Sequence, residues 1–364
     1  MKGGIVLLET GGGPLGVNIY DIAREAHVGI GTVSRVFNNR RNVSASTREK
    51  VLEVGRRLNY QPHASAQRLA RQRSNTISAI IPFFTNYFFV EVLQGVQDRV
   101  EQLGYDLILY GITRKGQTET YLRRTMQRGR VDGVLFFSMK FPEQFISRFQ
   151  QLRLPIVLVD TSLPEFDSIA VENRRGAYLA TAHLLALGHR RIGMINASLT
   201  SEPARLRLEG YRQALDDYGV QYDRNLVRFP KNLKSDGFNR EAGHDAMEEL
   251  LAMGGDRPSA AFAASDIQAF GALQSLREHS LHAPKDIALV GFDDIEFAQH
   301  VGLSTIHQPM YEIGTLAVDV LAARVENPDV VPRHTTFIPE LVVRETCGAG
   351  TMSPALRASR SMPV

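Results

Sequence analysis

The chain is 364 residues long, 43% of its residues are hydrophobic, and its formal net charge is +3. This length and composition predict two or three folded domains, and the single cysteine, Cys347, excludes a disulfide framework or a multi-cysteine zinc site. The sequence has no 18-residue apolar run and no secretory signal pattern, so we expect a cytoplasmic protein that neither spans nor contacts a membrane, with no cofactor and no metal.

The first 17 residues have no helical or alternating apolar period, and they include three consecutive glycines from Gly11. We therefore expect residues 1–17 to be a disordered leader, and we assign them no role.

Two short helices are predicted next. Apolar residues recur at helical spacing from Ile19 to Ala26 and again from Val33 to Phe37. Because Val28 and Gly29 interrupt the pattern, the two helices should meet at a turn.

A third helix is predicted from Ser46, where Ser46 and Glu49 have the spacing of a capping box ahead of further apolar residues. The three helices would form one small domain over residues 18–61. Pro62 suits the first turn of a fourth helix that reaches roughly Ala70. About nine residues do not hold a helix in water by propensity alone, so this segment needs a partner to fold.

After Ser74 the sequence alternates between apolar segments and amphipathic segments. This rhythm predicts parallel strands joined by helices, with Gly104 and Gly188 ending two of the helices. The predicted fold is a small all-α head and an α/β body of two doubly wound lobes with a cleft between them. The predicted strands are 77–82, 105–110, 131–137, 156–159, 192–195, 260–264 and 287–292.

Positive charge is concentrated near the front of the chain. Residues 18–73 contain 11 Lys and Arg against 4 Asp and Glu, whereas residues 74–364 contain 30 against 34. No acidic residue lies between Glu53 and Glu91, so a polyanion can approach this stretch without meeting like charge. We predict that the polyanion is a nucleic acid.

Residues 32–39, TVSRVFNN, have the pattern of the second helix of a helix-turn-helix. Val33, Val36 and Phe37 fall on one face, which suits packing, and the opposite face carries short polar residues and a cation. Taken alone, the same pattern also fits an ordinary solvated helix face. The outward residues are Thr32, Ser34, Arg35 and Asn38.

The longer stretch IYDIAREAHVGIGTVSRVFNN, followed by NVSASTREKVLEVGRRLNYQPHASAQRLA, closely resembles the N-terminal segment of LacI/GalR transcriptional regulators. The resemblance implies a dimeric repressor that binds double-stranded operator DNA. It also implies that a small, sugar-like effector modulates the operator affinity.

Within this resemblance, Ile30 and Gly31 occupy the two most variable base-reading positions, and both are poor hydrogen-bond formers. We therefore expect Arg35 and thymine-methyl contacts of Ile30 to carry most of the major-groove discrimination. Gly29 stands where the family usually has an N-cap serine, which weakens the second helix by about a few tenths of a kcal/mol. The resemblance also assigns operator contacts to Tyr20 and backbone contacts to Asn42, Ser44 and Thr47.

Residues 62–74 resemble the family's hinge helix, which forms when two subunits meet over DNA. Leu69 matches a leucine that is wedged into the central minor groove, where it unstacks a base step at a cost of about a few kcal/mol. Internal packing of Leu69 is the alternative. His63 replaces the usual asparagine at a phosphate contact, and Ala66 is the remaining hinge candidate for DNA contact.

Ligands in open α/β sheets bind beyond the carboxyl ends of the strands. The first predicted strand runs into the aromatic segment 83–89, the fourth ends at Asp160, and the last long strand ends at Asp293. Aromatic faces stack on a sugar ring or a purine, and carboxylates bind paired hydroxyls. Arg205 and Arg207 follow the fifth strand, and a guanidinium suits hydroxyls or acids.

The resemblance extends from Thr76 to about Thr346. It implies a ligand-binding and dimerisation domain of the periplasmic-binding-protein-like type I over residues 75–346, followed by a disordered tail over 347–364. The ligand-binding candidates are Phe83, Phe88, Asp160, Arg207, Ser265, Asp293 and Gln308.

Several of these assignments have alternatives. Ser265 with Gln268 fits a capping box equally well, Asp294 fits a turn, and Phe84 or Phe89 fits the core. One family branch uses a phosphorylated carrier protein as corepressor, and residues 308–321 superficially resemble that branch. Asp319 takes the place of an arginine that meets the phosphoserine there, so we favour a small-molecule effector.

Two other protein classes compete with a regulator. An enzyme is disfavoured because the sequence has no G-x-G-x-x-G after the first strand, no P-loop, no G-x-S-x-G and no H-E-x-x-H. A solute-binding protein without DNA function shares the two-lobed body, but it has no use for a basic three-helix head. We therefore expect no catalytic residues.

Overall fold

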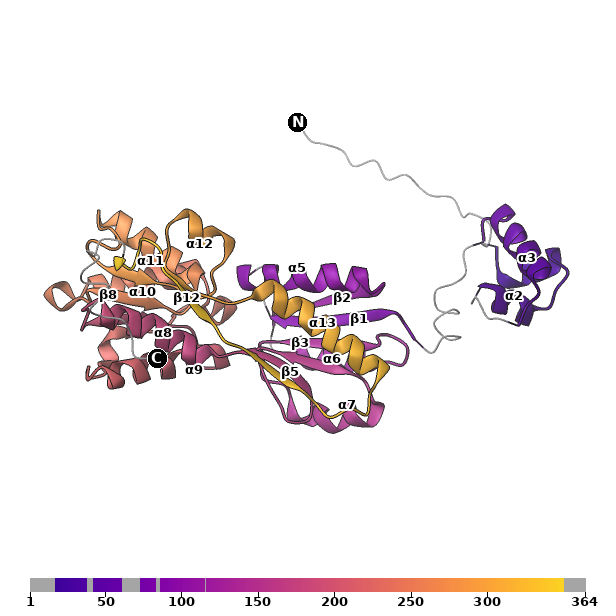
Figure 1. The fold of residues 1–364 in the computed structure, drawn as a ribbon, viewed down its shortest axis with the longest axis horizontal. Coiled ribbons are helices and arrows are strands. Elements are labelled where there is room, and N and C mark those ends of the chain that lie inside the picture. Colours follow the sequence, from indigo (N-terminus) through magenta and orange to yellow (C-terminus); the bar gives the residue numbers. More distant parts are fainter. Residues whose placement is uncertain (1–16, 38–41, 61–72, 83–85, 115, 350–364) are drawn as a thin grey trace, which may run out of the picture. The chain divides into compact units, whose positions relative to one another are not determined.

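The structure is a computed structural model that describes residues 17–37, 42–60, 73–82, 86–114 and 116–349. The chain divides into two compact units, Met1–Ser74 and Asn75–Val364, which we call the head and the body (Figure 1). Nearly all of the predicted leader, hinge and tail lies outside the described residues. None of the described helices is both long enough and apolar enough to cross a membrane.

The described residues of the head form three helices, α1 (Ile19–Glu25), α2 (Ile30–Phe37) and α3 (Ala45–Arg57). Their apolar residues meet in one small core because each helix repeats such residues every three or four positions. The half-buried rings of Phe37 and Tyr60 close this core edge to face, with their centroids 5.2 Å apart. The residues buried in the core are Ile22, Ala23, Ala26, Val33, Val36, Val51 and Val54.

The prediction that Ser46 caps the third helix is wrong. α3 begins at Ala45, and its N-cap is Ser44, whose Oγ accepts a hydrogen bond from the backbone N–H of Thr47 at 3.3 Å. Ser44 has the extended backbone that an N-cap requires, whereas Ser46 already lies in the first helical turn. Ser44 and Ser46 both lie near the start of α3, and the spacing of Ser46 and Glu49 led to the wrong prediction.

The N-terminal lobe of the body contains a six-stranded parallel sheet with strand order β11-β5-β4-β3-β1-β2. Side chains alternate across this sheet, so Ile77 and Ala79 of β1 face α5 and α13, while Ile80 faces the side of α6 and α7. Its elements are β1 (Thr76–Pro82), α5 (Tyr87–Gln102), β2 (Asp106–Ile112), α6 (Gln117–Thr125), β3 (Gly133–Phe137), η1 (Glu143–Phe145), α7 (Ile146–Leu152), β4 (Ile156–Val159), β5 (Asp167–Val171), α13 (Met310–Glu326) and β11 (His334–Phe337).

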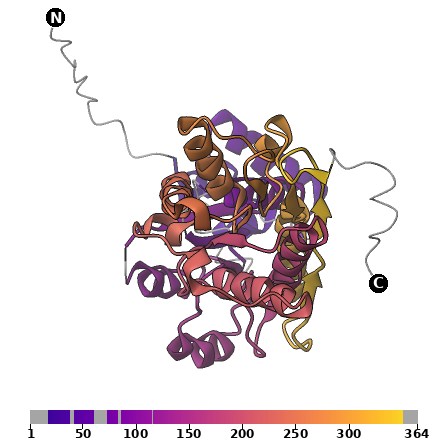
Figure 2. The same ribbon diagram turned by 90° about the vertical axis from the view of Figure 1, so that its left-hand side faces the viewer.

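The C-terminal lobe contains a four-stranded parallel sheet with strand order β7-β6-β8-β9. Helices cover both faces of this sheet (Figure 2). Met194 packs toward α8 and α9, and Ile195 packs toward α10 and α11. Its elements are α8 (Asn173–Ala186), β6 (Ile192–Ile195), α9 (Glu202–Asp217), η2 (Arg224–Leu226), β7 (Val227–Arg228), η3 (Lys234–Gly237), α10 (Arg240–Leu251), η4 (Gly254–Asp256), β8 (Ala260–Ala263), α11 (Asp266–Glu278), β9 (Ala288–Val290) and α12 (Glu296–His300).

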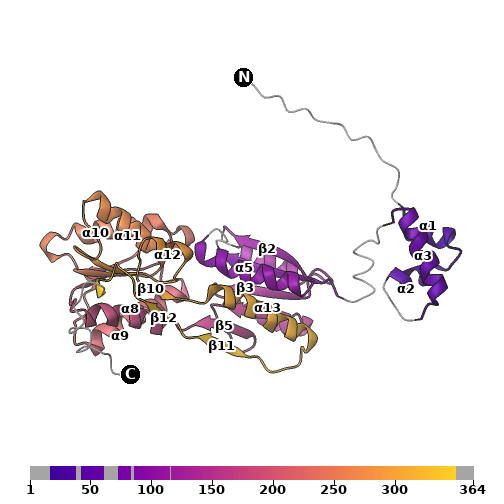
Figure 3. The same cartoon turned by 45° about the horizontal axis from the view of Figure 1, so that its top comes forward.

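The described chain passes between the two lobes three times: from β5 to α8, from β10 to α13, and from β11 to β12 (Figure 3). β10 (Thr305–His307) and β12 (Glu340–Val342) pair antiparallel beside the C-terminal sheet. These passages tie the lobes together while leaving the carboxyl ends of both parallel sheets free to line a cleft.

The predicted architecture of an all-α head and a doubly wound α/β body is confirmed. Each predicted strand is present, with ends shifted by at most two residues. The sequence pattern missed β5, β7, β10, β11 and β12. β7, β10 and β12 are only two or three residues long, so they contain no long apolar run. β11 lies at a sheet edge, and its residues are exposed or half-buried, so it contains no such run either.

Candidate functional site

A pocket lies between the two lobes, at the carboxyl ends of their strands. Ser138 follows β3 and Asp160 follows β4 in the N-terminal lobe, while Ser265 follows β8 in the C-terminal lobe. Parallel strands place all of these positions at one edge of each sheet. The pocket is lined by Pro82, Asn86, Phe88, Phe89, Ser138, Asp160, Ser201, Pro203, Arg207, Ser235, Asp236, Phe238, Ser265 and Asp293.

Arg207 lies on α9 and is 4% exposed. Its Nε donates a hydrogen bond to Oδ1 of Asn173 at 2.9 Å, and its Nη1 donates to the backbone carbonyl of Ala264. The same Nη1 lies 3.7 Å from Oδ1 of Asp293. The guanidinium also stacks over the ring of Phe292, 3.6 Å from the ring centroid. These contacts fix the orientation of a planar donor group at the pocket wall.

Asp160 is the acidic group of the N-terminal lobe at this pocket. Its Oδ2 accepts a hydrogen bond from the hydroxyl of Ser138 at 3.1 Å, and its Oδ1 accepts one from the amide of Asn173 at 3.3 Å. Asn173 therefore bridges Asp160 and Arg207, because its amide nitrogen and oxygen face opposite partners. The carboxylate and the guanidinium, which come from different lobes, are held in one network.

Asp293 is an acidic group that the C-terminal lobe contributes to the pocket. Its Oδ1 accepts a hydrogen bond of 2.7 Å from Nε2 of Gln308, which is 1% exposed. Gln308 does not itself line the pocket, so its contact with Asp293 gives it a positioning role.

The backbone is strained where these side chains enter the pocket. Ser138, Asp160 and Asp293 have φ values of 45°, 56° and 122°, which side-chain-bearing residues rarely adopt. Strain of this kind persists only where the surrounding structure enforces it, and it is concentrated at ligand-binding positions.

Burial controls the electrostatics of the pocket. It raises the pKa of Asp160 to about 6 and the pKa of Asp293 to about 7, although the Arg207 guanidinium opposes both shifts. Burial also lowers the pKa of Arg207, while the charge of Asp293 acts in the opposite direction. Asp266, which is buried behind the pocket, has a pKa well above its usual range for the same reason. Carboxyl groups thus outnumber cations here.

These raised values predict a pH dependence of stability. A carboxyl whose folded pKa exceeds its unfolded value near 4 binds protons more tightly in the folded state, so its stabilising contribution is complete below about pH 4. The contribution is lost as the pH rises through about 6 for Asp160 and about 7 for Asp293. Between about pH 4 and its folded pKa, each carboxyl should lower the free energy of unfolding by about 1.4 kcal/mol per pH unit.

The matched control is the double variant Asp160→Asn with Asp293→Asn, which keeps the side-chain shapes and removes both titrations. Urea unfolding at pH 5 and pH 7.5, without ligand, should show a larger loss of unfolding free energy in the wild type than in the double variant. Equal losses would contradict the assignment of these pKa values.

The structure brings together most of the predicted ligand residues. Phe88, Asp160, Arg207 and Asp293 line the pocket, and Phe83 lies outside the described residues. Ser265 satisfies both interpretations, because it lines the pocket while its Oγ accepts a hydrogen bond from the backbone N–H of Gln268 as the cap of α11.

The remaining residues considered near the predicted ligand site are Phe89, Arg205 and Asp294. Phe89 belongs to the core of the N-terminal lobe as well as to the pocket wall. Arg205 does not line the pocket; its guanidinium lies near Glu202 and Glu209 beside an adjoining hollow. Asp294 has a φ of 61° and pairs with Arg344 at 2.7 Å, which fits a turn residue.

Sequence reasoning missed several residues that the fold brings to the pocket. Asn173 follows β5, a strand that was not predicted, and Phe238 follows η3 in a connection without a periodic pattern. Asn86 caps α5, and its amide donates a hydrogen bond to the carbonyl of Phe238 at 3.3 Å, which joins the two lobes at the pocket. Asn173 comes two residues after the end of β5, so finding it depended on recognising that strand, and no local signal points to Phe238.

The head presents a second candidate site on α1 and α2. Tyr20 is 65% exposed and Ile30 is 42% exposed, which is high for large apolar groups. Gly31 and Arg35 are also exposed, and Nη2 of Arg35 donates to the Thr32 hydroxyl at 3.4 Å. The other described candidates are Thr32, Ser34 and Thr47, which are half-buried, and Asn42 and Ser44, which are exposed. Asn38, His63, Ala66 and Leu69 lie outside the described residues.

Comparison with known proteins matches each unit to a characterised family. Residues 18–63 match the family described as "Bacterial regulatory proteins, lacI family", and residues 181–347 match a "Periplasmic binding protein-like domain". The chain is 35% identical over 335 residues to the ribose operon repressor of Haemophilus influenzae, covering 90% of this chain and 97% of that protein. The chain belongs to the lacI family of bacterial regulatory proteins. It is a DNA-binding transcriptional regulator.

Two solved structures of relatives are similar to the structure of this lacI-family regulator. A lac repressor dimer bound to operator and the anti-inducer ONPF has a TM-score of 0.79 and 29% identity, covering 92% of this chain and 99% of that chain. A LacI family regulator from Enterococcus faecium with bound ribose has a TM-score of 0.67 and 26% identity, covering 74% and 98%. The expected family and fold are therefore confirmed for the regulator.

Proposed function

We propose that this regulator binds operator DNA as a homodimer, and that a small polyhydroxylated effector in the pocket between the lobes sets its operator affinity. The observation that carries the proposal is the buried network in which Arg207 and Asp293 of one lobe meet Asp160 of the other through Asn173. A ligand that replaces contacts in this network interacts with both lobes at once.

The chemistry of the pocket favours a neutral polyol. Asp160 and Asp293 supply carboxylate oxygens that accept hydrogen bonds from hydroxyl groups, and the Arg207 fork donates to hydroxyl oxygens. The rings of Phe88 and Phe238 add apolar surface for the face of a sugar ring. Because carboxyl groups outnumber cations, a phosphorylated ligand would meet net repulsion. Ribose is our first candidate, since the operon repressor relative is named for it and the Enterococcus faecium relative holds it.

We assign DNA recognition to the exposed face of α1 and α2. Arg35 would read a guanine edge, Ile30 would contact a thymine methyl group, and Tyr20, Gly31, Thr32 and Ser34 would complete the base-facing set. Backbone contacts from Asn42, Ser44 and Thr47 would fix the register. From the family resemblance we add Asn38, His63, Ala66 and Leu69 as further DNA contacts.

The coupling between the two sites follows from differential binding. An effector can shift the operator affinity only if it binds one arrangement of the lobes more tightly than the other. We propose that this arrangement sets the separation of the two hinge segments, residues 62–74, in the dimer. The protein would act in the cytoplasm, without catalytic activity of its own.

The test combines ligand binding with operator binding. Calorimetry with ribose, other pentoses, hexoses and ribose 5-phosphate should show binding of a free sugar and no binding of the phosphate ester. Fluorescence anisotropy with operator DNA should then show a change in operator affinity of about 5- to 150-fold with the sugar that binds. A sugar that binds without changing operator affinity would refute the coupling, and failure to bind any neutral polyol would refute the effector class.

A further inference from the structure

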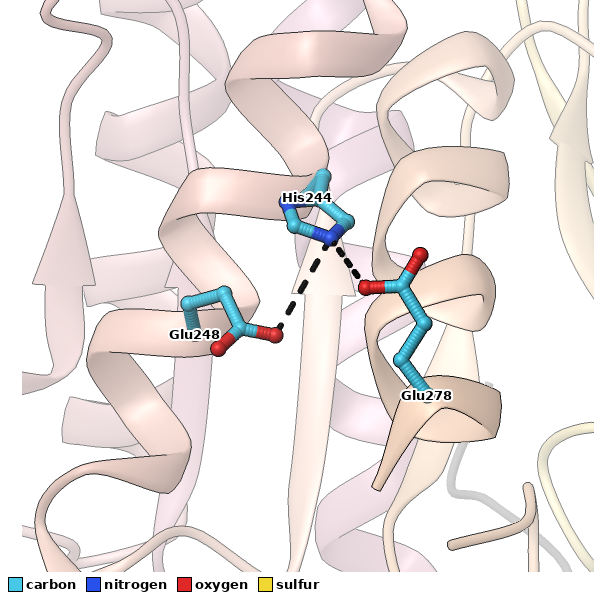
Figure 4. A group of neighbouring side chains, drawn as sticks. All are labelled: His244, Glu248 and Glu278. Carbon is cyan, nitrogen blue, oxygen red and sulfur yellow. Dashed lines mark hydrogen bonds and ion pairs between the residues drawn. The ribbon is translucent and has the colours of Figure 1, made fainter. Parts of the chain in front are cut away.

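A cluster of metal-ligating side chains lies in the C-terminal lobe, outside the ligand pocket. His244 and Glu248 are one turn apart on α10, and Glu278 ends the neighbouring helix α11 (Figure 4). Nε2 of His244 lies 2.8 Å from Oε2 of Glu278 and 4.0 Å from Oε1 of Glu248. One ligand atom from each of the three residues lies within 4.8 Å of the other two.

We propose that His244, Glu248 and Glu278 bind a divalent transition-metal cation of the Zn²⁺ type. Imidazole nitrogen and carboxylate oxygen lie about 2.0–2.2 Å from zinc, so atoms around one ion lie roughly 3–3.5 Å apart. The two distances from Nε2 of His244, 2.8 Å and 4.0 Å, lie on either side of that separation, and the two carboxylate oxygens lie within 4.8 Å of each other. Three protein ligands leave one position of a tetrahedral ion for water.

Each ligand is also oriented by a second hydrogen-bonding group. Nδ1 of His244 lies 3.5 Å from Oδ1 of Asp245, so a ring that bound a metal through Nε2 would keep this carboxylate as the acceptor for its Nδ1–H. Gln274 donates from Nε2 to Oε1 of Glu278 at 2.8 Å, which leaves Oε2 facing His244. A carboxylate behind the histidine and a donor behind the glutamate are the outer contacts that metal sites use.

Glu248 is oriented in the same way. The hydroxyl of Ser275 donates to its Oε1 at 2.6 Å, and Nδ1 of His279 lies 3.4 Å from the same oxygen. His279 Nδ1 is 3.0 Å from the backbone carbonyl of Ser275. This imidazole therefore stands at the edge of the site and is not needed as a ligand.

Close packing of the two helices fixes the ligand spacing. A Cβ on Gly243 would lie 2.0 Å from the carbonyl oxygen of Gln268, and a Cβ on Gly271 would lie 1.9 Å from the carbonyl oxygen of Arg240. The backbones of α10 and α11 thus touch directly beside His244. Because the helices cannot slide without a clash, the three ligands are preorganised and the ion would tie the two helices together.

Zinc titration of the tag-free full-length protein tests the proposal. Calorimetry should show saturable binding of one Zn²⁺ per chain, and the thermal midpoint should rise by a few degrees at saturation. His244→Gln and Glu278→Gln should each weaken zinc binding at least 10-fold. Asp245→Asn should weaken it by about 10- to 100-fold while leaving the three ligands in place.

The controls are His282→Gln and Glu241→Gln, which remove an exposed histidine and an exposed glutamate of the same lobe that do not belong to the cluster. Both should bind zinc as the wild type does, and all variants should match its thermal midpoint without zinc. The proposal is overturned if zinc does not bind at a 1:1 ratio, or if His244→Gln binds it as tightly as His282→Gln. Ribose binding should be unaffected in each case, since the cluster does not line the pocket.

Discussion

Effector binding should be lost in Arg207→Ala, with an affinity decrease of at least about 100-fold, and the body should be destabilised by about 3–5 kcal/mol. Arg207 is the cation in a buried network with Asp160 and Asp293, so its removal leaves carboxylates that are desolvated and uncompensated. The variant also loses the donors that we assign to sugar hydroxyls. Calorimetry with the sugar that the wild type binds, together with urea unfolding, measures the two losses separately.

Two further variants separate the structural role of Arg207 from its ligand role. Arg207→Met combined with Asp293→Asn removes both charges, so it should recover most of the lost stability while binding no sugar. Arg207→Lys keeps the positive charge but loses the planar fork, so it should retain stability better than affinity. If the double variant bound sugar as tightly as the wild type, the pocket would not be the effector site.

Operator recognition should depend on Arg35. In Arg35→Ala we expect operator affinity to fall by about 5- to 150-fold, the equivalent of the 1–3 kcal/mol of a bidentate contact with guanine. Arg35 is exposed on α2, whose opposite face is held in the core by Val33 and Val36, so the substitution leaves the packing of the head intact. Anisotropy titrations with operator DNA and with random duplex at equal salt measure the effect.

The matched control is Arg24→Ala, which removes an equal charge from α1, where Arg24 pairs with the adjacent Asp21 at 2.5 Å. This variant should weaken binding to both duplexes slightly and equally. Arg35→Lys keeps the charge and should still lose most of the discrimination between the duplexes. Equal losses for operator and random DNA in Arg35→Ala would show that Arg35 contributes charge alone.

Local patterns predicted much of this molecule because they report burial directly. The apolar runs at 156–159 and 192–195 became β4 and β6 with the predicted ends, since a fully buried parallel strand is apolar on both faces. The positions after such strands were equally informative. Asp160 and Asp293 were found because parallel topology puts every carboxyl end at one edge of a sheet.

Short or edge elements carried too little signal. β7 has two residues, and β11 alternates between exposed and half-buried positions, so neither forms an apolar run. The cap of α3 depended on which of two serines has an extended backbone, and spacing alone does not contain that information. Asn173 was missed for a related reason, since the unpredicted strand β5 places it beside Arg207.

Periodicity and charge in the chain were enough to establish a basic helical head, an α/β body and two acidic positions at the ends of strands. They could not show that Asn173 joins Asp160 to Arg207, that Phe238 closes the pocket, or that His244 faces Glu278. Sequence periodicity reflects which side of each element is buried, and burial is largely a local property. Convergence of distant side chains depends instead on how whole helices and sheets pack, including the backbone contact at Gly243.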